Sequence, residues 1–261
     1  MLHRLLITGA AGSIGQALRE GLRGDAEVLR LLDTQPLAAL PGEEAIQADA
    51  ADLEAMRAAM RGVDACVHLA AIPHEGPFLE LLNPNYISTW CVLEAARLEG
   101  CRRVVFASSN HAQGFEPVPP PGTPPSWDHP RPMHPDTYYG VSKVFGEAMG
   151  SMFHDKFGLE VACLRIGSFL PKPTTPRNLA TWLSPGDCVR LVRACLTAPD
   201  LGFRILPGIS RNTRRWWHLA EAEALGYDPQ DDAEEYVDQL DEAPVGDFQG
   251  GTLYTGPETT P

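Results

Sequence analysis

A glycine-rich turn near the start of the chain most constrains what this sequence can fold into. Gly9, Gly12 and Gly15 follow a strand-like run at Arg4–Thr8 and open a helix-like segment at Ser13–Arg23. There, Gly9 permits a tight turn, Gly12 lets a pyrophosphate approach the backbone, and Gly15 lets the helix pack on the strand. The free N–H groups at the helix N-terminus favour phosphate. The pattern predicts the first βαβ unit of a dinucleotide-binding domain, against the alternative of an ordinary tight turn.

Apolar, β-prone runs alternate with helix-like segments over the first two thirds of the chain. Such alternation implies right-handed crossovers and a mostly parallel sheet with helices on both faces. We therefore expect an α/β fold, a Rossmann-type doubly wound parallel sheet with a small C-terminal substrate lobe. The strand-like runs are Arg4–Thr8, Ala26–Leu32, Glu44–Gln47, Ala65–Ala70, Arg103–Ser108 and Val161–Ile166, and the helix-like segments are Ser13–Arg23, Asp52–Arg61, Phe78–Glu99 and Thr137–Phe157.

The chain shows no linker or repeat that would divide it, so residues 1–261 are expected to form a single domain. Residues 1–168 would be the nucleotide-binding core, and residues 169–261 a small substrate lobe with an acidic C-terminal segment. Ser184 before Pro185 is typical of a capped helix start. Phe203–Leu206 is a candidate last strand, and Trp216 with Trp217 is expected to pack the small lobe.

The net charge of −13 is concentrated at the C-terminal end, where twelve of the 34 acidic residues and no Lys or Arg follow Arg215. We interpret this segment as a solvated helix face and tail rather than a docking surface. Nucleic acid is not an expected partner, because no basic stripe is available to meet phosphates. No apolar run approaches the roughly 18 residues of a membrane span, and no secretory signal is evident, so we expect a cytoplasmic protein.

The six cysteines form no CxxC pair, and most of them lie in apolar runs, which predicts buried, reduced thiols. The eight histidines show neither HxH nor HExxH spacing. No metal site is therefore expected.

Asp33 ends the second strand-like run, 18 residues after Gly15. A carboxylate at this place suits the ribose hydroxyls of adenosine and repels a 2′-phosphate. No arginine lies beside Asp33 or in the glycine turn, so the expected cofactor is NAD rather than NADP. Asp49 ends the third strand-like run and is a candidate partner for the adenine amino group, or a helix cap.

Tyr139 and Lys143 are spaced i and i+4, which places both side chains on one face of a helix. A tyrosine has a reference pKa near 10, and an ammonium nearby is expected to lower that pKa by favouring the phenolate. Tyr139 is thus a candidate general base for the oxidation of an alcohol. Between the two candidate catalytic segments, Pro117–Pro135 holds nine of the 24 prolines, which predicts a loop at the rim of the site.

Together, the glycine turn and the Tyr139–Lys143 pair resemble the extended branch of the short-chain dehydrogenase/reductase superfamily. A narrower likeness to bacterial uronate dehydrogenases runs almost end to end. It rests on Phe106–His111, Tyr139–Lys143 with Phe145–Glu147, Arg165–Ser168, Thr181–Ser184, Trp216-Trp217 and Phe248–Gly251. This resemblance implies NAD-dependent oxidation of the C1 hydroxyl of glucuronate or galacturonate to an aldarolactone.

The resemblance also implies roles for individual residues. The catalytic group would be Tyr139, Lys143 and Ser109. NAD would be held by Gly9, Gly12, Ser13, Ile14, Gly15, Asp33, Asp49, Ala50, Leu69, Ala70, Ala71, Lys143 and Phe169. The sugar acid would be held by Ser109, Asn110, His111, Ser168 and Arg177. Arg177 would clamp the carboxylate, although a surface-loop arginine would look the same, and Asn110 and His111 could instead be turn formers.

Three departures from the family pattern concern the sugar rather than the reaction. Pro73 stands where the family has a serine that touches substrate, Phe115-Glu116 replaces an aromatic pair, and the proline-rich loop is longer. The alternatives are a nucleotide-sugar epimerase or dehydratase, another sugar dehydrogenase of the superfamily, or a non-catalytic NAD sensor. We expect a homo-oligomer, a dimer or higher, paired through Phe78–Glu99 and Thr137–Phe157.

Overall fold

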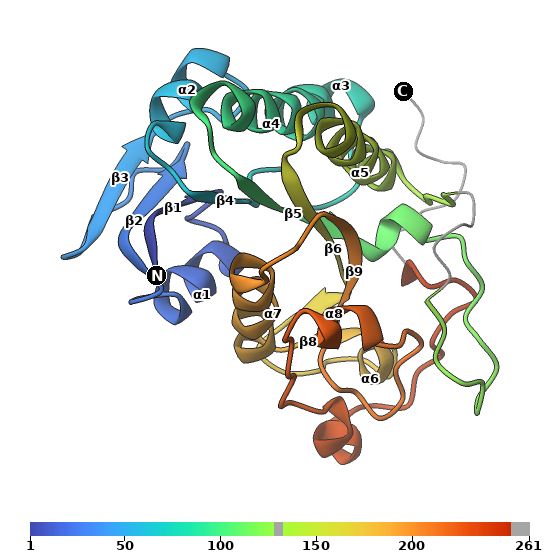
Figure 1. Cartoon of the computed structure of the whole chain (residues 1–261). Helices are drawn as coiled ribbons and strands as arrows, with labels where there is room; N and C mark the ends of the chain where they lie inside the picture. Colours follow the sequence, from blue (N-terminus) through green and yellow to red (C-terminus); the bar gives the residue numbers. More distant parts are fainter. Residues whose placement is uncertain (128–132, 252–261) are drawn as a thin grey trace.

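In the computed structural model, residues 1–127 and 133–251 are described, so part of the proline-rich loop and the C-terminal end lie outside the described residues. Seven parallel strands form one sheet in the order β3-β2-β1-β4-β5-β6-β9 (Figure 1). The strands are β1 (Leu2–Thr8), β2 (Ala26–Asp33), β3 (Glu43–Gln47), β4 (Ala65–His68), β5 (Arg103–Ser109), β6 (Glu160–Ile166) and β9 (Phe203–Gly208). From β1 the strand order runs to β2 and β3 on one side and to β4, β5, β6 and β9 on the other. Open α/β sheets bind their ligands at such a switch point, here between β1 and β4.

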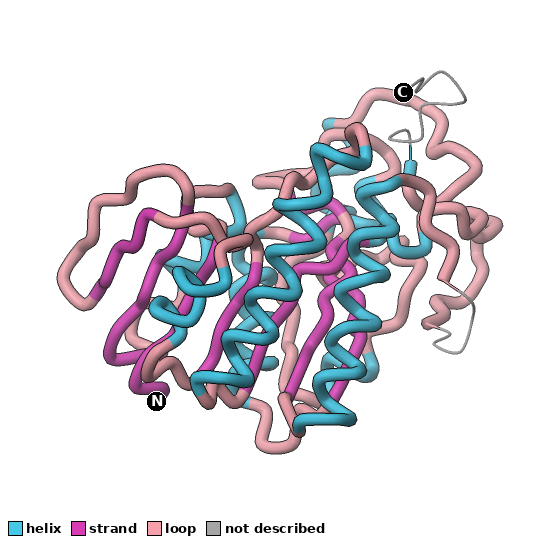
Figure 2. The backbone as a smooth tube through the Cα atoms, turned by 90° about the horizontal axis from the view of Figure 1, so that it is seen from above, coloured by secondary structure: helices cyan, strands magenta, loops and turns pink. Residues whose placement is uncertain are grey.

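Helices cover both faces of the sheet, as the alternation predicts (Figure 1). One face carries α2 (Leu53–Met60), α4 (Ser88–Glu99) and α5 (Tyr138–Phe157), and the other carries α1 (Ser13–Gly21) and α7 (Pro185–Thr197). The long helices of the first face run side by side over the strands in Figure 2. The doubly wound α/β fold is therefore confirmed.

Alternate side chains of each strand enter two separate hydrophobic cores. On β1, Leu5 and Ile7 pack toward α1 and α7, whereas Leu6 packs with Met56 and Met60 of α2. This alternation follows from the two-residue period of a strand and explains why the strands are apolar almost throughout. Burial on both sides fixes the register of the strands whose ends form the site.

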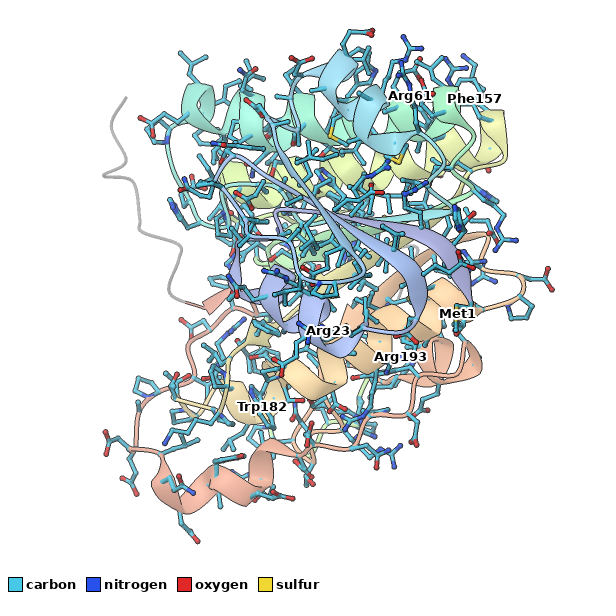
Figure 3. The ribbon with its side chains drawn as sticks, turned by 90° about the vertical axis from the view of Figure 1, so that its left-hand side faces the viewer. Met1, Arg23, Arg61, Phe157, Trp182 and Arg193 are labelled. Carbon is cyan, nitrogen blue, oxygen red and sulfur yellow. The ribbon has the colours of Figure 1, made fainter. Side chains whose placement is uncertain are left out.

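The segment after residue 168 contributes to the sheet layers as well as to a smaller lobe. α7 begins with Ser184 as N-cap, whose hydroxyl accepts the Asp187 N–H at 2.9 Å, as the sequence predicts. α7 lies beside α1, and Figure 3 labels Arg23 and Arg193 on this side of the molecule. Arg193 Nε donates to Asp25 Oδ2 at 3.0 Å, which joins α7 to the turn between α1 and β2. The smaller lobe contains the pair β7 (Ser168–Phe169) and β8 (Trp182–Leu183), with α6 (Asn178–Thr181) and α8 (Ala220–Ala224).

The predicted helix Phe78–Glu99 is not one regular α-helix. It consists of α3 (Phe78–Leu81), a π-helical turn at Leu82–Ile87 and then α4. Pro84 has no N–H to donate within this turn, so the regular bonding pattern cannot continue through it. The buried Asn85 side chain bonds the N–H and the carbonyl of Ile72, and thereby ties this turn to the loop after β4.

A short segment near the C-terminus returns to the body of the chain. Residues 247–251, here named the C-terminal strap, run antiparallel to residues 114–118. Val118 N–H donates to the Asp247 carbonyl at 2.9 Å, and Gln249 N–H donates to the Glu116 carbonyl at 2.8 Å. These bonds place the strap against the loop that leaves β5, close to the site described next.

Candidate active site

A cavity of about 740 Å³ opens at the carboxyl ends of the central strands. It brings together the residues after β1, β2, β4 and β5 with the first turns of α5. Every residue predicted to hold NAD lines it, Lys143 included, as do four further candidates for catalysis or substrate binding: Ser109, Asn110, His111 and Tyr139. Its volume lies in the usual range for small-molecule and cofactor sites.

The glycine turn fits a dinucleotide for steric reasons. Gly9 has a φ of +69°, and a Cβ there would lie 2.7 Å from the Ala70 nitrogen. A Cβ on Gly15 would lie 2.5 Å from the Gly9 carbonyl oxygen. The turn can therefore exist only with glycine at these places, and it leaves the N-terminus of α1 facing the cavity. That arrangement is a ready site for a pyrophosphate.

The acidic residues of the cavity lie where an adenosine ribose would be recognised. Asp33 Oδ2 accepts the Ala11 N–H at 2.9 Å, so the carboxylate is joined to the glycine turn. Lys143 is the one Lys or Arg among the described residues that line the cavity, and it lies at the other end, beside Tyr139. A 2′-phosphate would find no cation near Asp33 among these residues. Asp49 Oδ1 accepts the Ala51 N–H at 2.8 Å, so it caps a local turn and also lines the cavity.

Tyr139 and Lys143 face each other within the first turns of α5. Thr137 caps this helix by accepting the Gly140 N–H at 2.9 Å, and Glu75 accepts the Tyr139 N–H at 3.0 Å. Lys143 Nζ lies 5.3 Å from the centroid of the Tyr139 ring. Ser109, the last residue of β5, makes a side-chain hydrogen bond that lowers the pKa of Tyr139. The three predicted catalytic residues therefore lie together.

Burial changes the expected protonation of this pair. Burial raises the pKa of Tyr139 to about 12, and the bond from Ser109 opposes this rise only in part. Burial also lowers the pKa of Lys143 to about 8, while the nearby Glu147 carboxylate raises it. The prediction that Lys143 brings the Tyr139 pKa below its ordinary value is wrong for the free protein, because desolvation disfavours both charged forms.

The other predicted substrate residues form a connected group beside the cavity. Arg177 precedes α6, and its Nη1 donates to the hydroxyls of Ser168 at 3.1 Å and Thr181 at 3.3 Å. Its Nη2 donates to the Gln249 carbonyl of the strap, and Asn110 Nδ2 donates to the same carbonyl at 3.2 Å. Ser168 and Arg177 thus lie next to Asn110, although they do not line the cavity itself.

Arg177 carries a charge that no carboxylate of the described residues neutralises by an ion pair. No carboxylate of the described residues lies within 4.0 Å of its guanidinium, and its buried Nε has no hydrogen-bond partner among them. Burial lowers the pKa of Arg177 to about 10, an effect that the more distant Asp136 opposes. A buried, unsatisfied guanidinium donor is costly, and a bound carboxylate would satisfy it with planar geometry.

The sequence assigned no role to three residues of this group. Thr181 bonds Arg177, and Gln249 bonds both Arg177 and Asn110. Thr181 and Gln249 lie in runs that carry the family resemblance, whereas Asp136, which bonds His111, lies in none. Their roles depend on contacts between distant segments. The run Phe248–Gly251 marks the strap, but only its return to residues 114–118 places Gln249 at the site.

Two negative findings concern the described residues only. Within residues 1–127 and 133–251, no cluster of three or more His, Cys, Asp or Glu side chains could hold a metal ion. No helix in the same part of the chain is long and apolar enough to cross a membrane.

Comparisons with known proteins agree with this geometry. Residues 5–198 match the NAD dependent epimerase/dehydratase family. Uronate dehydrogenase from Pseudomonas putida is 43% identical, over 96% of this chain and 95% of that protein. Uronate dehydrogenase from Agrobacterium fabrum is also 43% identical, over 98% of both chains.

A solved structure extends the likeness to three dimensions. It is a tyrosine-to-alanine mutant of uronate dehydrogenase from Agrobacterium tumefaciens complexed with NAD. It superposes with a TM-score of 0.90 at 42% identity and covers 97% of both chains. The chain therefore belongs to the NAD-dependent epimerase/dehydratase family, in the group formed by the uronate dehydrogenases.

Proposed function

We propose that this protein oxidises the C1 hydroxyl of a hexuronate, glucuronate or galacturonate, to an aldarolactone, with NAD as the oxidant. The observation that carries the proposal is the guanidinium of Arg177 beside the Tyr139 cavity, which forms no ion pair with the described residues and whose Nε has no hydrogen-bond partner among them. A dinucleotide site alone would fit many oxidoreductases. A half-buried cation near the reacting end selects substrates that bring a carboxylate of their own.

The residues predicted for NAD would hold it along the cavity. The glycine turn and the N-terminus of α1 would bind the pyrophosphate, and Asp33 the adenosine ribose. When bound, the nicotinamide ring accepts the hydride that leaves C1. The protein contributes orientation and charge around the transfer.

Tyr139 would remove the proton of the C1 hydroxyl. Ser109 would hold the same oxygen, since its side chain already bonds Tyr139. The Lys143 ammonium, 5.3 Å from the Tyr139 ring centroid, would favour the phenolate once the site is filled. Because the free protein keeps Tyr139 protonated to a pKa of about 12, activity in the oxidation direction should rise with pH.

Asn110, His111, Ser168 and Arg177 would hold the sugar. Asn110 and Arg177 give hydrogen bonds to the Gln249 carbonyl in the free protein, so both donors already face one point. Pro73 lines the cavity without a hydroxyl to offer, so one hydrogen bond to the sugar would be absent there. We expect this loss to affect the preference among uronates rather than the reaction.

The alternatives make different demands on the site. An epimerase or dehydratase of nucleotide-sugars would need room for a nucleotide diphosphate, and the segment after Ser168 is largely used by α7, β9 and the small lobe. A non-catalytic NAD sensor would need no Ser109, Tyr139 and Lys143 in one place. A dehydrogenase of neutral sugars would need no cation, such as Arg177, to bind a carboxylate.

The test is the formation of NADH from NAD with glucuronate, galacturonate and the matching neutral aldoses. We expect turnover of the uronates, with kcat/KM for the neutral sugars lower by at least about a hundredfold, because they leave the half-buried guanidinium of Arg177 without a carboxylate partner. In Arg177→Leu, kcat/KM for uronates should exceed kcat/KM for neutral sugars by only a few-fold. Equal rates with neutral aldoses, or no uronate turnover by protein that binds NAD, would contradict the proposal.

We also propose that the protein works in the cytoplasm as one domain and as a homo-oligomer. All six cysteines are free and buried, which suits a reducing compartment. Exposed apolar side chains gather on α3 and the start of α5, among them Phe78, Leu79, Tyr138 and Val141. A second copy of the chain would cover them.

A further inference from the structure

His111 and Asp136 form a buried pair at the edge of the cavity. His111 Nδ1 lies 2.9 Å from both carboxylate oxygens of Asp136. The side chains are 7% and 1% exposed, so water does not compete for this contact. His111 lines the cavity, whereas Asp136 lies behind it.

The surroundings hold the Asp136 carboxylate in one position. The Thr137 hydroxyl donates to its Oδ1 at 3.1 Å. Gly114 and Gly250 approach it so closely that a Cβ on either would collide with the carboxylate. The two glycines are themselves joined by a bond of 2.9 Å from Gly250 N–H to the Gly114 carbonyl. Asp136 therefore has little freedom to leave His111.

A carboxylate can only accept hydrogen bonds, so the nitrogen that faces it must carry a proton. In the neutral imidazole this leaves Nε2 with a lone pair. Within the described part of the chain, no partner bonds Nε2, and the His111 ring centroid lies 5.8 Å from that of Tyr139. The free acceptor is thus beside the group that takes the proton from the substrate.

We infer that Asp136 is a positioning residue, which fixes the Nδ1–H tautomer of His111 so that Nε2 accepts a hydrogen bond from the C2 hydroxyl of the substrate. The inference rests on the proposed function, because C2 carries the sole ring hydroxyl adjacent to the reacting C1. The opposite tautomer would present an N–H instead, and the hydroxyl would need to accept. Asp136 would in this way determine specificity without touching the sugar.

The first experiment needs neither substrate nor a variant of Asp136. Long-range ¹H–¹⁵N spectra of the native protein distinguish a protonated from a bare ring nitrogen, and the His111 signals are those missing from His111→Asn. We expect a protonated Nδ1 and a bare Nε2 at neutral pH. A bare Nδ1, or an imidazolium protonated at both nitrogens, would overturn the inference.

The second experiment uses Asp136→Asn, whose amide can either accept from Nδ1 or donate to it. The measurement is the ratio of kcat/KM for glucuronate to kcat/KM for 2-deoxyglucuronate. We expect a ratio of at least about ten in the native protein, since the analogue leaves a buried acceptor unpaired. In Asp136→Asn the ratio should fall below about three. Both substrates carry the same carboxylate, so any change in the contact of Arg177 cancels.

Asp187→Asn is the matched control, because Asp187 is a fully buried carboxylate of α7 whose partners are Arg190 and the backbone N–H groups of Gln230 and Asp231. It should leave both the His111 signals and the ratio as in the native protein. An unchanged ratio in Asp136→Asn, or an equal drop in Asp187→Asn, would contradict the inference. If the native protein turned over no uronate, the proposed function would fail, while the spectra would still decide the tautomer.

Discussion

At the scale of single residues, the site places a charge where the fold disfavours one. Lys143 is 5% exposed, and burial lowers its pKa to about 8. Spacing alone predicted that Tyr139 and Lys143 share a helix face, and the structure confirms it. The pKa of Tyr139 could not be predicted in the same way, because burial depends on every element packed around α5.

Because the buried ammonium of Lys143 lowers the free energy of unfolding, we predict that Lys143→Met is more stable than the native protein at pH 7. The folded pKa of Lys143 is about 8, against about 10.5 in the unfolded chain, so the cost is about 3 kcal/mol below pH 8. The folded state binds fewer protons between these values, so the cost disappears as pH rises from 8 to 10.5. Urea unfolding at pH 7 and pH 10 should show the advantage of the variant shrinking.

The same variant should lose activity although it gains stability. Without the ammonium, kcat for uronate oxidation should fall by about 10²–10⁴-fold, because the phenolate of Tyr139 loses its nearest cation. Lys172→Met is the control, since Lys172 is exposed and away from the cavity. A stability difference that does not vary with pH would refute the assignment of the cost to a buried charge.

At the scale of elements, long segments with clear periodicity were predictable and short ones were not. The six strands and the helices α1, α2 and α5 follow from apolar patterns, within a few residues at their ends. The predicted helix Phe78–Glu99 is instead interrupted by the π-helical turn at Leu82–Ile87. The β7–β8 pair and α6 are only two to four residues long, too short for any periodicity to show. The strap is recognisable as a motif, but its position depends on pairing with a loop more than a hundred residues away.

The strap predicts a steric effect at Gly250. A Cβ there would collide with the Asp136 carboxylate, so Gly250→Ala should push the strap away from Asn110 and Arg177. Overpacking of this kind costs about 1–3 kcal/mol, so kcat/KM for uronate should drop about tenfold or more while NAD affinity stays within about threefold. Gly76→Ala is the control, because a Cβ at Gly76 meets nothing within 4 Å. Equal effects of the two substitutions would show that the strap does not shape the substrate site.

At the scale of the whole molecule, the parallel sheet and its ligand edge could be predicted because alternating elements permit few topologies. The sequence predicts pairing through Phe78–Glu99 and Thr137–Phe157, but it could not show which side chains of these segments are exposed, since exposure depends on the folded chain. Leu79 is 79% exposed and Tyr138 is 53% exposed. Light scattering should give at least twice the chain mass, and Leu79→Glu should reduce it to the monomer. A monomeric native protein would contradict the proposed assembly.

The central claim is that the chain transfers a hydride from C1 of a uronate to NAD. The most direct test is the reaction of galacturonate deuterated at C1, followed by mass spectrometry of the nicotinamide product. We predict that the NADH formed carries the deuterium, and that Tyr139→Phe binds NAD but forms little product. NADH without the label, or label retained in the sugar product, would contradict the account.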